Sequence, residues 1–217
     1  MRKTITLLTF LAALMLNYTA RASHAMGGEI TYTWMGGNVY ELQFNFYRDC
    51  AGIPAPATVT ATASSGCSAP ISVPMQATAL SPQLVAPNCP GTATTCNGGT
   101  LNGIEKWTYT GIVTLTGPCA DWTFSITECC RNAAVTNLAN PAGENAYYSA
   151  MLNNLAVPFN SSVKMASDPV PYLYSGRSNY YNNGAYDAEN DSIVVTLVDA
   201  LGGPGTPVAY TSGFSEI

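Results

Sequence analysis

Histidine and charged side chains are scarce in this chain. Only 10% of its 217 residues are charged, and His24 is its one histidine. Ser–His or Cys–His chemistry therefore lacks a base in the body of the chain, and neither GxSxG nor HExxH occurs. A glycosidase with a carboxylate pair is the enzyme class that the scattered acidic residues leave open. The sequence predicts no catalytic residues and a protein that is not an enzyme.

Long apolar runs are also absent, apart from one near the N-terminus. Basic residues at positions 2 and 3 precede an uncharged apolar run over 5–16, and Ala20-Arg21-Ala22 follows. This order is typical of a secretory signal peptide. The run is about a dozen residues, whereas a membrane span needs roughly 20. We expect a signal peptide over residues 1–22 and a secreted, extracellular or cell-surface protein with no transmembrane segment.

Removal of that peptide makes the chain more acidic. Three of the eight basic residues leave and all 13 acidic residues remain, which gives a net charge of −8. This sign argues against nucleic acid and anionic membranes as partners. The expected partners are extracellular proteins or glycans.

Apolar residues alternate with polar residues along much of the chain, and no helical stripe appears after the signal peptide. Examples are Tyr40, Leu42, Phe44 and Phe46, which share one face of a strand. Four prolines between residues 54 and 74 indicate edge strands and loops. The pattern predicts an all-β fold, an immunoglobulin-like β-sandwich over residues 23–157. The expected strands cover 28–34, 39–48, 57–63, 71–76, 75–85, 105–115, 122–130 and 147–155.

Seven cysteines indicate disulfide bonds in an exported chain, with one thiol left over. A pair between Cys89 and Cys96 would fasten the loop that holds them. Cys129 and Cys130 are predicted to point to opposite faces of a strand and to join different partners. Zinc is disfavoured because Cys89 and Cys96 lack a second CxxC or a histidine partner. The disulfide candidates are Cys50, Cys67, Cys89, Cys96, Cys119, Cys129 and Cys130.

Residues 158–217 are predicted to be a linker and the start of a second β-domain. The acidic run Asp187-Ala188-Glu189-Asn190-Asp191 precedes an expected strand over 192–199. Carboxylates this close repel one another unless a hard cation such as calcium (Ca2+) lies among them, and the alternative is a solvated acidic turn. About 50 residues follow position 165, fewer than the roughly 90 of a sandwich domain. We therefore expect this second domain to be truncated.

Several motifs together resemble the N-terminal region of large Bacteroidetes surface proteins. Those proteins are strings of cadherin-like or PKD-type domains that end in a gliding-motility-associated domain exported by type IX secretion. The resemblance implies an adhesion or gliding protein attached to the outer membrane surface through C-terminal domains beyond this sequence. The motifs are Ala22-Ser23-His24, Gly27-Gly28-Glu29-Ile30-Thr31-Tyr32, Tyr47-Arg48-Asp49-Cys50, Glu128-Cys129-Cys130-Arg131-Asn132-Ala133-Ala134 and Asn137-Leu138-Ala139-Asn140.

The resemblance also favours calcium at the acidic run. It implies carboxylate ligands from Asp187, Glu189 and Asp191 and a carbonyl oxygen from Asn190. This chain departs from the family pattern, since Ala188 and Asn190 stand where the family shows Pro and Gly. Cysteines that the family shows near the positions of Phe159 and Tyr174 are absent here as well.

Two functions follow from these patterns. The first is a structural or adhesion module, in which Arg48 and Arg131 neutralise Asp49 or Glu128 beside disulfides. The second is a carbohydrate-binding module with an aromatic platform, for which Tyr180 and Tyr181 are the best exposed candidates. The other aromatic candidates are Trp34, Trp107, Trp122, Tyr147 and Tyr148.

Overall fold

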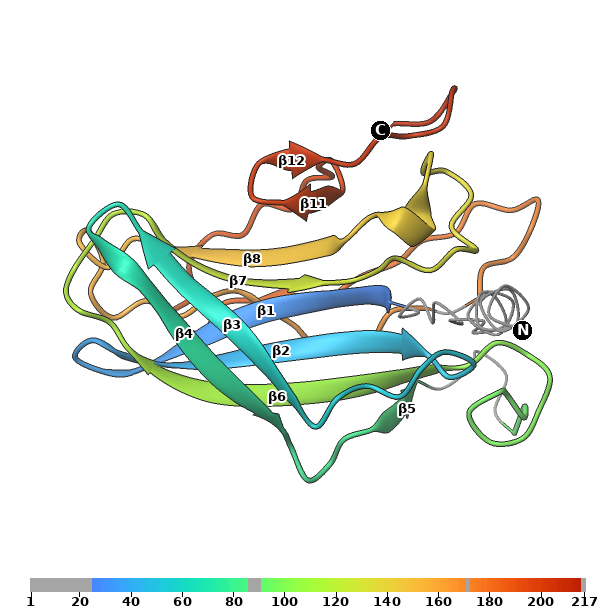
Figure 1. Ribbon diagram of the computed structural model, residues 1–217, viewed down its shortest axis with the longest axis horizontal. Coiled ribbons are helices and arrows are strands. Elements are labelled where there is room, and N and C mark those ends of the chain that lie inside the picture. The colour runs from blue at the N-terminus through green and yellow to red at the C-terminus, as the bar shows by residue number, and fades with distance from the viewer. Residues whose placement is uncertain (1–24, 86–90, 171, 216–217) are drawn as a thin grey trace, which may run out of the picture.

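The regular secondary structure of the described chain is almost entirely β-strand (Figure 1). The computed structural model describes residues 25–85, 91–170 and 172–215, so the predicted signal peptide lies outside the described residues. The all-β prediction is confirmed. The elements are β1 (Ala25–Gly36), β2 (Val39–Asp49), β3 (Thr58–Ser65), β4 (Ser68–Ala77), β5 (Gln83–Val85), β6 (Ile104–Thr114), β7 (Trp122–Glu128), the 3-10 turn η1 (Pro141–Gly143), β8 (Ala146–Leu152), β9 (Lys164–Met165), β10 (Ala185–Tyr186), β11 (Leu201–Gly203) and β12 (Thr206–Pro207).

One antiparallel sheet contains the first eight strands. Its order is β1-β2-β6-β4-β3-β7-β8, with β5 paired to β6. The two edge strands, β1 and β8, contact each other, and the Tyr32 hydroxyl donates a hydrogen bond to the Met151 carbonyl oxygen (3.0 Å). The sheet therefore curls onto itself as a barrel-like sandwich, which we call the barrel.

The core of the barrel follows the predicted alternation. Tyr40, Leu42 and Phe44 on β2 have no exposed surface, and Trp122 and Phe124 on β7 are equally buried. Burial of each such side chain stabilises the fold by about 1.5–3 kcal/mol. The alternation fails near the end of β1, where Trp34 shares a face with the buried Ile30 and Tyr32 and is itself 38% exposed.

The turn between β1 and β2 depends on two glycines. Gly36 and Gly37 have φ angles of 119° and 55°, a region that glycine occupies without a steric penalty.

The prediction of edge strands among the prolines is wrong, because β3 and β4 lie in the interior of the strand order. Pro70 and Pro74 are tolerated because β4 pairs with β6 only at Gln76 and Ala77.

Residues 161–170 and 172–186, which we call the strap, cross the outer face of β1 and β2. Tyr32 N donates to Ser162 Oγ (2.8 Å), and Ser162 N donates to Tyr32 O (2.9 Å). Further along, β9 pairs with β10. The sequence suggested a linker for the first part of this segment, but residues of the strap contact the barrel. The domain boundary at residue 158 stays a prediction.

The predicted strand over residues 192–199 is wrong, because these residues pair with no described strand. Their apolar side chains are exposed, with Val194 at 85% and Leu197 at 75%. The chain then returns to the barrel, where β11 contacts β8 and the Arg131 guanidinium donates to Leu201 O (2.9 Å). Val208, 4% exposed, is buried there.

Candidate functional site

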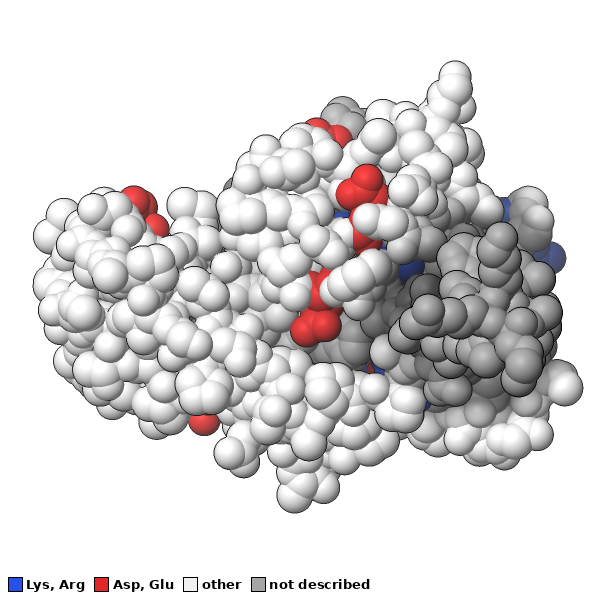
Figure 2. Space-filling model, in the orientation of Figure 1, with Lys and Arg blue, Asp and Glu red and all other residues white. Residues whose placement is uncertain are grey.

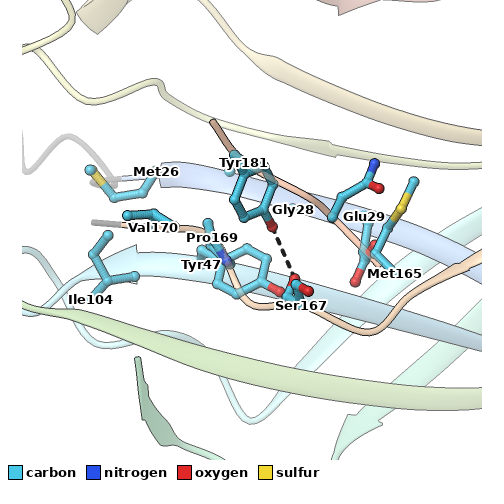
Figure 3. Close-up of a pocket in the computed structure, with 12 residues that line it drawn as sticks. Met26, Gly28, Glu29, Tyr47, Ile104, Met165, Ser167, Pro169, Val170 and Tyr181 are labelled. Atoms are coloured by element: carbon cyan, nitrogen blue, oxygen red, sulfur yellow. Dashed lines mark hydrogen bonds between the residues drawn. The ribbon is translucent and has the colours of Figure 1, made fainter. Parts of the chain in front are cut away.

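A pocket of about 360 Å³ lies between the strap and the outer face of the barrel (Figure 3). Its two ends differ in chemistry. Met26, Ile104 and Val170 lie at one end of the pocket, Glu29 lies at the other end beside Met165, and Tyr47 and Tyr181 lie between them (Figure 3). The remaining lining residues are Gly27, Gly28, Ser167, Pro169 and Asn183.

Strand alternation and strap contacts place these side chains. Ile30 on β1 faces the core, so its neighbour Glu29 faces outward beneath the strap. Tyr181 donates from its hydroxyl to the carbonyl oxygens of Ser167 (3.1 Å) and Asp168 (3.2 Å). Lys106 on β6 forms an ion pair with Asp168 (2.7 Å). The Tyr181 hydrogen bonds thus join two parts of the strap to each other, and the ion pair fastens the strap to β6.

The carboxylate of Glu29 has lost much of its water. Burial raises the pKa of Glu29, and the hydrogen bond from Asn45 Nδ2 (2.8 Å) and the charge of Lys106 only partly offset this. The Asn45 amide is held in this orientation because its Oδ1 accepts from Thr108 Oγ1 (2.9 Å). On the opposite face of the barrel, seen in Figure 2, most of the described surface is neither acidic nor basic.

We expect Glu29→Gln to increase the free energy of unfolding at pH 7. A raised folded pKa favours the folded state below the unfolded pKa of about 4.5, and this contribution is lost as pH rises through the folded value. The glutamine side chain stays neutral, so no charge is buried at pH 7, and its carbonyl oxygen can still accept the hydrogen bond from Asn45. Urea unfolding should show the gain at pH 7 and a smaller one at pH 3.5. A variant that is less stable than the original chain at pH 7 would contradict the expectation.

Of the aromatic residues predicted to bind ligand, the structure places only Tyr181 in this pocket. Its neighbour Tyr180 is 96% exposed, whereas Trp122 is fully buried. Trp34 packs against Phe159 at 6.3 Å between ring centroids.

Trp34 and Trp107 do not form a shared platform. Trp34 on β1 pairs with Tyr40 on β2, and Trp107 on β6 pairs with Phe46 on β2. Tyr40 and Phe46 are six positions apart along β2, so the two tryptophans lie roughly 20 Å apart. Trp107 stacks on Tyr109 instead, at 6.2 Å. Tyr147 and Tyr148 lie on β8, and Tyr148 packs against Phe44 at 5.3 Å.

The acidic run forms a self-bonded turn. Asp187 Oδ1 accepts from the backbone N–H groups of Glu189 (2.9 Å) and Asp191 (3.0 Å), and Asn190 adopts a φ of 67°. Among the described residues, the group of metal-ligand side chains whose atoms gather within 4.8 Å is Cys67, Cys119 and Asp121, and its two sulfurs are joined in a disulfide. As they lie, the predicted calcium ligands do not form a cage.

Calcium at this turn stays a prediction, and the turn geometry decides how to test it. Asp187→Ala would remove two backbone hydrogen bonds whether or not calcium binds, at a cost of about 1–2 kcal/mol. Glu189→Gln with Asp191→Asn removes charge and keeps Asp187. If calcium binds, it should raise the melting temperature of the original chain and not of this double variant. An equal melting temperature in calcium and in chelator would leave only a solvated turn.

The six described cysteines form three disulfides with one another: Cys50–Cys96, Cys67–Cys119 and Cys129–Cys130. The predicted Cys89–Cys96 pair is wrong, because the loop returns to the end of β2, where Cys50 N donates to Gly103 O (2.9 Å). Cys89 itself lies outside the described residues. Separate partners for Cys129 and Cys130 are also wrong. Strand β7 ends at Glu128, so strand alternation does not govern these two residues.

The two arginines are structural, but their predicted carboxylate partners are wrong. Arg48 pairs with Glu105 (2.8 Å) and not with its neighbour Asp49, which instead accepts from Asn132 Nδ2 (3.2 Å). Arg131 donates to backbone carbonyl oxygens, including that of Asn145 (3.1 Å), and not to Glu128. Side chains of consecutive strand residues point to opposite faces, which explains why Arg48 does not reach Asp49.

Sequence reasoning missed Glu29, Tyr47 and Asn183 as members of one site. An isolated Glu within a strand carries no local signal, and the pocket exists only because the strap crosses β1. The one usable signal was a tyrosine in a polar stretch, and it found Tyr181.

No protein-family model, curated protein or solved structure matches this chain. Separately, the described residues contain no helix with the length and apolarity to cross a bilayer.

Proposed function

We propose that this chain is a non-enzymatic, secreted cell-surface module for structure or adhesion, the N-terminal part of a larger adhesin or gliding-associated protein. The observation that carries the proposal is a barrel closed by disulfides at both ends. The first strand pair of β6 with β2 joins Ile104 to Asp49, and the last joins Thr114 to Val39. The Cys50–Cys96 bridge lies at the first end and Cys119, after β6, at the other.

Such an arrangement suits a protein that works outside the cell under mechanical load. The two disulfides enclose sequence separations of 46 and 52 residues, so most strands between β2 and β7 lie within a covalent loop. Disulfides of this kind persist in oxidising surroundings. The edge strands are also protected, because the strap hydrogen-bonds to β1 and β11 contacts β8.

The finer assignment rests on the sequence resemblance described above. On that basis the barrel is the immunoglobulin-like N-terminal domain, and residues 158–217 lead into a cadherin-like domain. Type IX secretion would export the protein, and C-terminal domains beyond this sequence would hold it at the outer membrane surface.

The proposal is tested in cells that produce the full protein. Antibody against the barrel should label intact cells, and deletion of the gene should reduce attachment to a surface or gliding across it. Complementation with a Cys67→Ala, Cys119→Ala protein, which lacks one disulfide, tests whether attachment or gliding depends on a stable barrel. Labelling only after cell lysis, or unchanged attachment and gliding in the deletion strain, would overturn the proposal.

A carbohydrate-binding module is the second candidate. The observation in its favour is Tyr181, an exposed aromatic residue predicted from sequence that lines the pocket beneath the strap. Against it, the tryptophans form no open platform. Binding to a glycan array that is lost in Tyr181→Ala would favour this function.

A further inference from the structure

We propose that the pocket beneath the strap binds the ammonium-tipped side chain of a partner polypeptide, a lysine in an extended segment. The idea that this polypeptide is a partner of an adhesive module rests on the proposed function. Binding of a lysine side chain to the purified protein does not depend on that function. The pocket, with its volume of about 360 Å³, lies at the lower limit of small-molecule sites, which run from about 300 to 1,000 Å³. It therefore suits a single side chain better than a chain of sugars.

The order of groups along the pocket matches the order of groups along a lysine side chain. Met26, Ile104 and Val170 offer apolar contacts for the methylene stem (Figure 3). Tyr47 and Tyr181 lie in the middle, where their rings can contact the stem and attract a cation. Glu29 at the far end supplies the carboxylate that an ammonium group requires.

The charges around Glu29 explain why a cation from outside is favoured. Lys106, the basic side chain whose charge lowers the pKa of Glu29, is already paired with Asp168, so it neutralises Glu29 only in part. Asn45 donates one hydrogen bond to Oε1. A partly desolvated carboxylate with one neutral donor gains from an incoming ammonium group more than an exposed one would. The net charge of −8 expected after removal of the signal peptide also draws basic partners toward the chain.

Glycine at position 27 allows the pocket to be filled without disturbing the barrel. An added Cβ at Gly27 meets no atom within 4 Å, and its φ lies outside the left-handed region. Gly27→Leu therefore extends a side chain into open space at the pocket wall. Gly117, beyond the far end of β6, has the same open surroundings and provides a matched control.

The test is an NMR titration of the oxidised chain with Nα-acetyl-lysine methylamide. The neutral probe is Nα-acetyl-norleucine methylamide, which keeps the stem and lacks the ammonium group. The lysine probe should shift the amide resonances of the pocket and bind at least tenfold more tightly than the neutral probe. Glu29→Gln should remove this tenfold preference, Gly27→Leu should abolish binding, and Gly117→Leu should leave it unchanged.

Three results would overturn the inference. They are equal binding of the two probes, unchanged lysine binding in Glu29→Gln, and no response at the pocket. Monosaccharides that bind more tightly than the lysine probe would assign the pocket to glycans instead. Thermal unfolding of each variant shows that it is folded. Loss of lysine binding with normal surface attachment would reject this inference alone, because attachment tests the proposed function separately.

Discussion

Replacing Arg48 with alanine is expected to lower the free energy of unfolding by about 3–5 kcal/mol. Arg48 Nε lies 2.8 Å from Glu105 Oε1, and the two side chains are only 9% and 12% exposed. The guanidinium also donates to the carbonyl oxygens of Gly52 and Ile53, beyond the end of β2. Alanine would leave a buried carboxylate whose remaining described donor is Trp107 Nε1 (2.7 Å), because the Cys50 sulfur is in a disulfide and carries no proton.

Urea unfolding followed by tryptophan fluorescence measures this loss. The matched control is Lys106→Ala, which breaks the more exposed ion pair with Asp168 and should cost only about 0–1 kcal/mol. Arg48→Met with Glu105→Leu removes both charges and should cost less than Arg48→Ala alone, because no unpaired charge remains buried. If Arg48→Ala costs no more than Lys106→Ala, the buried pair does not hold this end of the barrel.

The strands and the core could be predicted from sequence because their signal is local. Tyr40, Leu42 and Phe44 alternate with polar residues, and that period alone assigns one face of β2 to the interior. The same signal failed at residues 192–199. An apolar alternation there predicts a strand, but a strand also requires a partner ladder, which the described chain does not provide.

The candidate site was harder to predict from sequence because it depends on contacts between segments that are distant along the chain. The strap meets β1 through Ser162 and Tyr32, 130 residues apart, and no periodicity within either segment indicates that contact. Partner choice among the cysteines fails for the same reason. Cys96 lies seven positions from Cys89 in sequence, yet its Cα lies 5.0 Å from that of Cys50.

The second large effect is expected when either long-range disulfide is removed. Bridges with sequence separations of 46 and 52 residues should each contribute about 4 kcal/mol by restricting the unfolded chain. For a domain of this size, that loss lowers the melting temperature by about 8–16 °C. Cys50→Ala with Cys96→Ala and Cys67→Ala with Cys119→Ala are the two test variants. Cys119 is only 2% exposed, so the second pair also leaves a small cavity and should be the more costly.

The third bridge provides the control for this prediction. Cys129 and Cys130 are adjacent, so their disulfide encloses no loop and Cys129→Ala with Cys130→Ala should change the unfolding free energy far less. All variants carry Cys89→Ser, which prevents thiol exchange with the seventh cysteine. Peptide mapping of the oxidised chain under non-reducing conditions verifies the three pairs before unfolding is measured. If all three double variants lose similar stability, loop closure is not the source of the stabilisation, and the argument that two terminal bridges hold the barrel under load fails with it.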